Sequence, residues 1–198
     1  CGEAVETKIF QSDQIEEAAA LLRNGELVAF PTETVYGLGA NALLAESVKQ
    51  VFAVKGRPSD NPLIVHVANF SMTEEFVESY HPLTETIIKH FWPGPLTLIF
   101  KIKTGSLSPV VTGGLSTAAF RMPDNKKTLF LIEKTGAPLV GPSANTSGKP
   151  SPTTALHVYH DLSGKISGIL DDGATEIGVE STVLDLSGDQ PTILRPGA

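Results

Sequence analysis

The chain has almost no cysteine: among its 198 residues only Cys1 carries a thiol. A single thiol excludes an intramolecular disulfide and a cysteine-based zinc site, and it agrees with a reducing compartment. No apolar run in the sequence approaches the roughly 20 residues that a membrane-spanning helix needs, and no signal-peptide pattern opens it. These absences predict a cytoplasmic protein with no membrane partner.

Positive charge is also scarce. The sequence has 15 Lys and Arg residues against 22 Asp and Glu, a formal net charge of -7, which argues against a broad electropositive surface for duplex nucleic acid. The cations are nevertheless concentrated: Lys55, Arg57, Arg121, Lys149 and Arg195 lie in or beside segments rich in Gly, Pro, Ser and Asn. Local basic sites on an acidic protein indicate small anionic ligands.

The composition and the apolar spacing predict one layered α/β domain covering residues 1–198. Helical spacing predicts one helix between Asp13 and Gly25 and further helices over 45–55, 72–80, 83–92, 124–135 and 153–161. Short apolar runs predict strands at 27–30, 63–67, 95–102, 117–122, 138–141, 167–170, 181–186 and 191–194. Because the last strands follow one another through turns, some pairing must be antiparallel, and the sheet is expected to be mixed.

The most informative segment, 141–152, reads GPSANTSGKPSP and contains hydroxyls, an amide, glycines and a lysine with almost no apolar side chain. Such a loop contributes little to a core. Its backbone N–H groups and short polar side chains can instead converge on an anion. The segment is therefore predicted to bind phosphate.

Two other segments follow predicted elements and carry polar side chains. Thr34 comes just after the strand 27–30, and side chains at strand ends in α/β sheets commonly face the ligand crevice. The alternative is a plain strand-to-helix connection, in which the glycines serve only for turning. Lys55 and Arg57 lie in a proline-stiffened loop that suits a polyphosphate, although a solvated turn is the alternative. His66, in a strand, is by itself more typical of a core residue.

Arg121 lies in a predicted strand, where it shares one face with Thr117. A buried arginine requires either a carboxylate partner or an anionic ligand. Taken alone, the segment favours a structural salt bridge. Ser181 and Arg195 are equally inconspicuous in isolation.

Seven segments together have a recognisable order. PTETVYGLGANA, KGRPSDNPL, FWPGPLTL, AAFRMPD, GPSANTSGKPSPT, ESTVLDL and ILRPG follow one another from about residue 10 to the end. In this order they resemble the YrdC-type threonylcarbamoyl-AMP synthases. The resemblance implies a YrdC-like domain with a twisted mixed parallel and antiparallel sheet, flanking helices and a concave substrate cleft. It also implies a nucleotidyltransferase that makes L-threonylcarbamoyl-adenylate and pyrophosphate from L-threonine, bicarbonate or CO2, and ATP with Mg²⁺.

The resemblance further implies the site residues and partners. Lys55 and Arg57 are expected to be catalytic. L-Threonine is expected to bind at Thr34, His66, Arg121, Gly141 and Ser181. ATP is expected to bind at Arg57, Asn61, Thr117, Ser143, Ser151 and Arg195. No residue is expected to ligate a metal directly, and the product is expected to pass to a threonylcarbamoyl transferase complex, so that tRNA is reached indirectly.

Alternatives remain open at this point. An RNA-binding module and the carbamoyl-adenylate-forming domain of hydrogenase-maturation carbamoyltransferases both share the implied fold. Longer relatives continue through a linker into a second domain, so the chain is expected to be either a single-domain member or an excised catalytic domain whose linker begins at residues 195–198.

Overall fold

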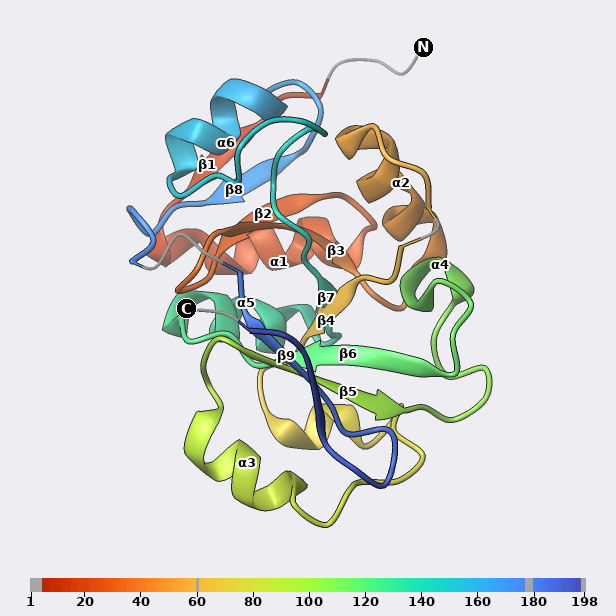
Figure 1. Ribbon diagram of the computed structural model, residues 1–198. Coiled ribbons are helices and arrows are strands. Elements are labelled where there is room, and N and C mark those ends of the chain that lie inside the picture. Colours follow the sequence, from red (N-terminus) through yellow and green to blue (C-terminus); the bar gives the residue numbers. More distant parts are fainter. Residues whose placement is uncertain (1–4, 60, 177–179, 197–198) are drawn as a thin grey trace.

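The computed structural model describes residues 5–59, 61–176 and 180–196, so Cys1 and the last two residues of the expected linker lie outside the described residues. Its described part has one ten-stranded mixed sheet, in the order β1-β8-β2-β3-β7-β4-β6-β5-β9-β10 (Figure 1). The strands are β1 Lys8–Phe10, β2 Val28–Pro31, β3 Tyr36–Asn41, β4 Ile64–His66, β5 Leu96–Lys101, β6 Thr117–Arg121, β7 Leu139–Val140, β8 Gly168–Leu170, β9 Thr182–Asp185 and β10 Thr192–Arg195. The layered α/β prediction is confirmed.

Helices cover the sheet. They are α1 Ile15–Arg23, α2 Ala45–Lys55, α3 Thr84–Phe91, α4 Pro109–Thr112, α5 Lys126–Thr135 and α6 Ala155–Leu162, with two 3-10 turns at Ser12–Gln14 and Phe70–Thr73. α1 and α5 pack side by side, while α6 and α3 lie toward opposite ends of the molecule (Figure 1). Asn125 and Thr154 cap α5 and α6 by accepting a hydrogen bond from a first-turn N–H group.

The sheet is mixed because pairing changes direction several times. β4 pairs parallel with β6, and β5 parallel with β9, whereas β9 and β10 form an antiparallel pair. The antiparallel ending expected from the turn-linked strands is confirmed.

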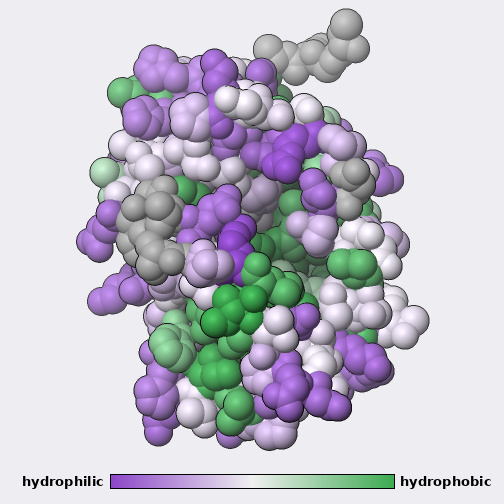
Figure 2. Space-filling model, in the orientation of Figure 1, coloured by the Kyte–Doolittle hydropathy of each residue, from purple (hydrophilic) through white to green (hydrophobic). Residues whose placement is uncertain are grey.

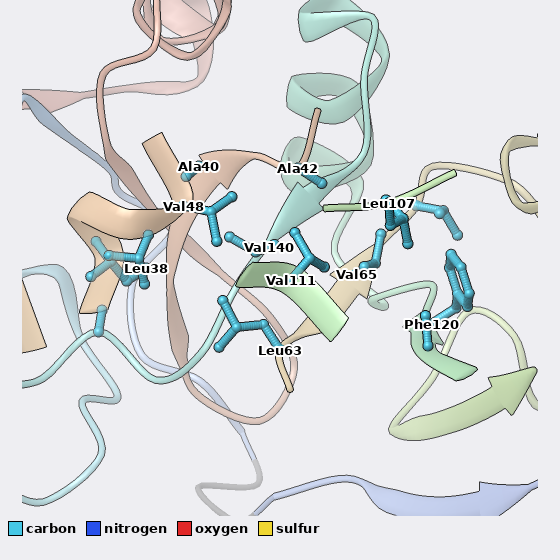
Figure 3. Close-up of a cluster of buried hydrophobic side chains, with 14 of the residues drawn as sticks. Leu38, Ala40, Ala42, Val48, Leu63, Val65, Leu107, Val111, Phe120 and Val140 are labelled. Atoms are coloured by element: carbon cyan, nitrogen blue, oxygen red, sulfur yellow. The ribbon is translucent and has the colours of Figure 1, made fainter. Parts of the chain in front are cut away.

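The central strands are buried on both faces. Along β2, Val28 and Phe30 belong to one apolar cluster with α1 and α5, and Ala29 belongs to the other. Figure 3 shows part of this second cluster, where Leu38 and Ala40 of β3 lie near Val48 of α2. Alternation along each strand thus supplies two cores, one on each side of the sheet.

The structure corrects the predicted helix over 72–80. Only Phe70–Thr73 is helical, as a 3-10 turn, and the chain beyond it runs beside β5: Glu78 N–H donates to the Lys101 carbonyl at 2.9 Å, and Lys103 N–H donates to the Phe76 carbonyl at 2.7 Å. These long-range backbone bonds take over after the first turn: Val77 N–H still donates to the Thr73 carbonyl at 2.9 Å, but no helix continues beyond it, and Phe76 and Val77 are buried.

Three elements were missing from the prediction: β1, β3 and the short helix α4. The most important is β3, since its segment was expected to be a connection. Tyr36, Leu38 and Ala40 alternate with glycines, and a Cβ at Gly39 would lie 2.5 Å from the Val28 carbonyl oxygen of the neighbouring strand. The glycines therefore permit close strand pairing rather than only a turn.

Apolar side chains also reach the surface. Figure 2 shows a hydrophobic area low on this face, over α3 and the terminal strands, where a groove of about 340 Å³ is lined by Ile87, Phe91, Pro95, Leu96, Thr182, Leu184 and Ile193. None of these described lining residues is charged. The groove is therefore chemically unlike the polar cavity described next.

Candidate active site

A second, polar cavity of about 270 Å³ opens where segments distant in sequence converge. Several segments contribute side chains to it. They include the β2–β3 connection, the end of α2 with the loop after it, the end of β6, the loop after β7, the residues before β9 and the end of β10. Its lining residues are Thr34, Val35, Phe52, Lys55, Arg57, Asn61, Pro62, Leu63, Ile64, His66, Arg121, Gly141, Pro142, Ser143, Glu180, Ser181 and Arg195. Four of them are cations and one is a carboxylate.

Arg121, the last residue of β6, is held by three protein groups. Its Nε donates to the Gly94 carbonyl at 3.3 Å, its Nη1 donates to Thr34 Oγ1 at 3.2 Å, and its Nη2 forms an ion pair with Glu33. Burial, and secondarily the positive charge of Arg195, lowers the pKa of Arg121 to about 10. The guanidinium is therefore still charged at neutral pH.

His66, the last residue of β4, is buried and neutral. Burial lowers its pKa to about 4, so the ring is uncharged at pH 7, and its Nδ1 lies 3.2 Å from the Ile64 carbonyl oxygen. The ring packs edge-on against Phe30 at a centroid distance of 5.2 Å. It also lies against Gly141, where a Cβ would come within 2.9 Å of His66 Cε1.

Ser181 lies between two groups of contacts. Its hydroxyl is 2.7 Å from the hydroxyl of Thr97, which is fully buried on β5, and its carbonyl accepts from Arg195 Nε and Nη2 at 3.1 and 2.9 Å. Arg195 Nη1 in turn pairs with Glu180 at 2.8 Å. Ser181 is thus oriented by Thr97 through its hydroxyl and by Arg195 through its carbonyl.

Lys55 ends α2 and is almost fully buried. Its ammonium donates to the carbonyls of Ser143 and Asn145 at 2.5 and 2.8 Å, and its own carbonyl accepts from Ser147 N–H at 2.8 Å. Burial, and next the charge of Arg57, lowers its pKa to about 8. Lys55 therefore fixes the polar loop from inside while its charge faces the cavity.

The same loop is fixed from α6. Asp161 accepts from the backbone N–H of Thr146 at 2.7 Å and from its hydroxyl at 2.9 Å. Because the loop has almost no apolar side chains, these hydrogen bonds and those to Lys55 determine its shape.

Ten of the twelve predicted site residues line this one cavity: Thr34, Lys55, Arg57, Asn61, His66, Arg121, Gly141, Ser143, Ser181 and Arg195. Two do not. Thr117 begins β6, whose other end carries Arg121 roughly 13 Å away at the usual rise of a strand. Ser151 lines a separate cavity of about 300 Å³ with Lys149 and His157. The roles of all twelve stay predictions.

The sequence analysis missed three residues that the structure connects to the site. Glu33 pairs with Arg121, Glu180 pairs with Arg195, and Asn145 accepts from Lys55 through its carbonyl. Glu33 and Glu180 are next to predicted site residues in the sequence. Their positions in the sequence do not show that their ion-pair partners are the distant residues Arg121 and Arg195. The sequence signal was limited to the need of a buried arginine for either a carboxylate partner or an anionic ligand, and it did not identify which carboxylate.

The cavity has two chemically different sides. On one, Arg121, Thr34, His66 and Ser181 offer a fixed guanidinium, hydroxyls and a neutral imidazole, a set suited to a small polar molecule with a carboxylate. On the other, Arg57 is exposed and its side chain has no hydrogen bond or ion pair within the described part of the chain, and it stands beside Lys55 and the polar loop. That side suits phosphate groups.

Comparisons with known proteins identify a family for the chain. The Sua5/YciO/YrdC family model, described as telomere recombination, matches residues 20–197. A threonylcarbamoyl-AMP synthase of Bacillus subtilis is 59% identical over 184 residues, covering 93% of this chain and 53% of that protein. Its counterpart in Pyrococcus abyssi is 54% identical, covering 93% of this chain and 54% of that protein.

A solved structure extends the likeness to three dimensions. The crystal structure of P. abyssi Sua5 complexed with L-threonine superposes with a TM-score of 0.92 at 51% identity, covering 96% of this chain and 58% of that one. The chain spans about half the length of these two curated relatives. No helix in the described residues is long and apolar enough to cross a membrane.

Proposed function

The chain belongs to the Sua5/YciO/YrdC family, and from this membership we propose that it is an L-threonylcarbamoyladenylate synthase. It would join L-threonine, bicarbonate or CO2, and ATP into L-threonylcarbamoyl-adenylate and release pyrophosphate. The observation that carries the proposal is the convergence of a fixed guanidinium with hydroxyls on one side of a cavity and of Lys55 and Arg57 on the other. One substrate is an amino acid and another a triphosphate, so the two sides match the two substrates.

The reaction needs no covalent attachment to the protein. The amine of threonine adds to the carbon of CO2, supplied directly or from bicarbonate, and loses a proton to give a carbamate. A carbamate oxygen then attacks the α-phosphorus of ATP, and the bond to the pyrophosphate oxygen breaks. Catalysis rests on holding the reactants in line and on neutralising the charge of the leaving group.

Each side chain has a proposed part in this sequence. Arg121 binds the threonine carboxylate, with Thr34 and Ser181 contacting its polar groups. His66 is neutral and packed against Gly141, so it shapes the pocket without adding charge. Arg57 binds the phosphates, and Lys55 holds the loop at Ser143 while placing its charge near them.

ATP contacts at Asn61, Thr117, Ser143, Ser151 and Arg195 remain part of the proposal. Thr117 and Ser151 are the weakest members, since neither lines the cavity that contains the others.

Mg²⁺ is proposed to enter with ATP, as part of the substrate. Within the described residues, Glu180 is the one carboxylate lining the cavity, and it already pairs with Arg195. No group of three or more His, Cys, Asp or Glu side chains is placed to hold a metal ion in the described part. The donors present suit phosphate oxygens, which would carry the ion themselves.

The proposed setting follows from the proposed product. The adenylate would pass to a threonylcarbamoyl transferase complex for modification of the tRNA adenosine next to the anticodon, with tRNA contacted indirectly and the protein in the cytoplasm. We propose residues 1–198 as one catalytic domain, whether alone or within a longer chain.

The proposal is tested by following pyrophosphate release with ATP, Mg²⁺, bicarbonate and each amino acid in turn. Release is expected only when threonine and bicarbonate are both present, and mass spectrometry should find threonylcarbamoyl-adenylate. Release that continues without threonine or without bicarbonate would rule the activity out.

A variant separates the two sides of the cavity. Replacing Arg121 with Ala is expected to weaken threonine binding strongly while leaving the affinity for a nonhydrolysable ATP analogue within about twofold, because Arg121 contacts neither Lys55 nor the polar loop. Unchanged threonine affinity in Arg121→Ala would remove its carboxylate role.

A further inference from the structure

Glu33 is a largely buried carboxylate that lines a neighbouring cavity rather than this one, and it contacts this cavity through Arg121. It lies in the β2–β3 connection, between Thr32 and Thr34. Its side chain is 10% exposed and that of Arg121 is 5% exposed. A buried ion pair is costly to maintain, and removing one partner leaves the other charge buried and uncompensated.

Both oxygens of Glu33 are engaged. Oε1 pairs with Arg121 Nη2, and Oε2 accepts from the backbone N–H of Asp124 at 2.9 Å. Asp124 immediately precedes the N-terminal cap of α5. The carboxylate is therefore tied to the fold on one side and to the guanidinium on the other.

The backbone carrying Glu33 is rigid as well. Thr32 Oγ1 accepts from the N–H groups of Thr34 and Val35, both at 3.1 Å, and donates to the Val35 carbonyl at 2.7 Å. Thr34 Oγ1, 2.9 Å from Thr32 Oγ1, also accepts from Arg121 Nη1. The Thr34 hydroxyl and the Glu33 carboxylate, which belong to one short turn, thus both contact the Arg121 guanidinium.

This pair differs from the other ion pair at the cavity. Glu180 and Arg195 have side chains that are 61% and 42% exposed, so water can replace either partner. Glu33 cannot leave Arg121 without abandoning a buried charge. The Glu33–Arg121 pair is therefore the less exposed of the two ion pairs at the cavity.

We propose that Glu33 is a positioning residue for amino-acid binding: it fixes the plane of the Arg121 guanidinium so that at most two of its five N–H bonds remain for the substrate carboxylate. Gly94, Thr34 and Glu33 each occupy one of the three guanidinium nitrogens. Because all three nitrogens are held, the guanidinium has one orientation. Its remaining N–H bonds therefore point in fixed directions and favour a ligand whose carboxylate lies in their path. The inference rests on the proposed function, since it assigns the carboxylate to threonine.

The test compares threonine with threonine methyl ester, which lacks the charged carboxylate, by calorimetric binding to three chains. Wild type is expected to prefer the free acid strongly. In Glu33→Gln, which keeps an oxygen for Asp124 N–H but loses the charge, that preference should shrink by about tenfold, a typical coupling for groups in one network. Glu33→Asp, which keeps the charge, should recover part of it.

Steady-state kinetics supply a second readout. The KM for threonine should rise in Glu33→Gln, while kcat and the KM for ATP stay within about twofold, a split that a general loss of structure would not give. Glu46→Gln is the matched control, because it removes the charge of an exposed carboxylate in a surface ion pair with Lys49. It should behave as wild type in every measurement.

The outcomes separate the two hypotheses. If wild type and Glu46→Gln fail to bind threonine, the proposed function is wrong. If wild type binds threonine but Glu33→Gln and Glu33→Asp keep the full preference for the free acid, the positioning role is wrong and the function stands. Tighter threonine binding by Glu33→Gln would show that Glu33 competes with the substrate, which also overturns the inference. If Glu33→Gln fails to fold, the ratio of the affinities of Glu33→Asp for threonine and for threonine methyl ester decides the test alone.

Discussion

At the scale of single residues, the site depends on groups whose ordinary properties burial has altered. Lys55, His66 and Arg121 each have a pKa lowered by burial. Lys55 and Arg121 keep their charge at neutral pH because their lowered pKa values, about 8 and about 10, still lie above 7, whereas the pKa of His66, about 4, lies below it. The sequence shows which residue types are present, but the pKa of each follows from its surroundings.

His66 should make stability depend on pH. Its folded pKa of about 4 lies below the ordinary value of about 6.5, so the unfolded chain takes up the proton first and stability falls as pH drops through this window. From pH 7.5 to pH 5, His66 should account for a loss of about 2 kcal/mol. Urea unfolding at both pH values should show a smaller loss in His66→Gln; equal losses in the two chains would contradict the assignment.

Gly141 should not tolerate a side chain. A Cβ there would lie 2.5 Å from Phe30 Cζ and 2.9 Å from His66 Cε1, so Gly141→Ala must displace one of these rings. We expect a loss of about 1–3 kcal/mol in unfolding free energy together with weaker threonine binding. Gly188→Ala is the control, since a Cβ there meets nothing within 4 Å. Wild-type threonine binding by Gly141→Ala would show that His66 does not shape the pocket.

At the scale of elements, the polar loop after β7 has a defined shape because α2 and α6 hold it. Asp161 on α6 accepts two hydrogen bonds from Thr146, and Lys55 on α2 donates to the carbonyl of Asn145 and accepts from the N–H of Ser147. A loop so poor in apolar side chains has no core of its own, so its conformation is set by these charged and polar contacts.

Asp161→Asn should therefore weaken ATP binding from a distance. The variant weakens two charge-assisted bonds, and we expect an affinity for a nonhydrolysable ATP analogue lower by about three- to tenfold, with threonine affinity unchanged without nucleotide. Asp185→Asn removes a comparable turn contact, to Ser187, that is not part of this loop. Equal ATP affinities in the two variants would mean that the loop does not bind ATP.

At the scale of the whole molecule, one sheet with a core on each face brings the site together. Arg121, His66 and Gly141 stand at the ends of β6, β4 and just beyond β7, and these strands are neighbours although they are far apart in sequence. The relative positions of these three residues therefore depend on the pairing of the strands that carry them.

The two cores should respond to truncation as close-packed interiors do. Leu131→Ala, on the fully buried face of α5, should lower the free energy of unfolding by about 2–5 kcal/mol. Leu156→Ala, where the side chain is 59% exposed, should change it by no more than about 0.5 kcal/mol. Urea denaturation at one pH measures both, and similar losses would contradict the assigned burial.

The sequence by itself determined most of the local structure. Apolar spacing located α1, α2, α5 and α6, because a helix or strand must turn one stripe or face to the core whatever its neighbours are. Polar composition located the loop at 141–152, and the order of seven segments identified the family. Ten of the twelve predicted site residues share one cavity, and the resemblance to the family was needed to predict several of them, since His66, Arg121 and Ser181 indicate no ligand when taken alone.

Tertiary structure alone decided which groups become partners. It made Tyr36–Asn41 a strand, because glycines allowed close approach to β2, and it replaced a helix near Phe76 and Val77 by pairing beside β5. It placed Glu33 on Arg121 and the loop carbonyls on Lys55. These outcomes depend on residues tens of positions apart, and the free energy of a buried contact depends on both partners, so neither segment alone contains it.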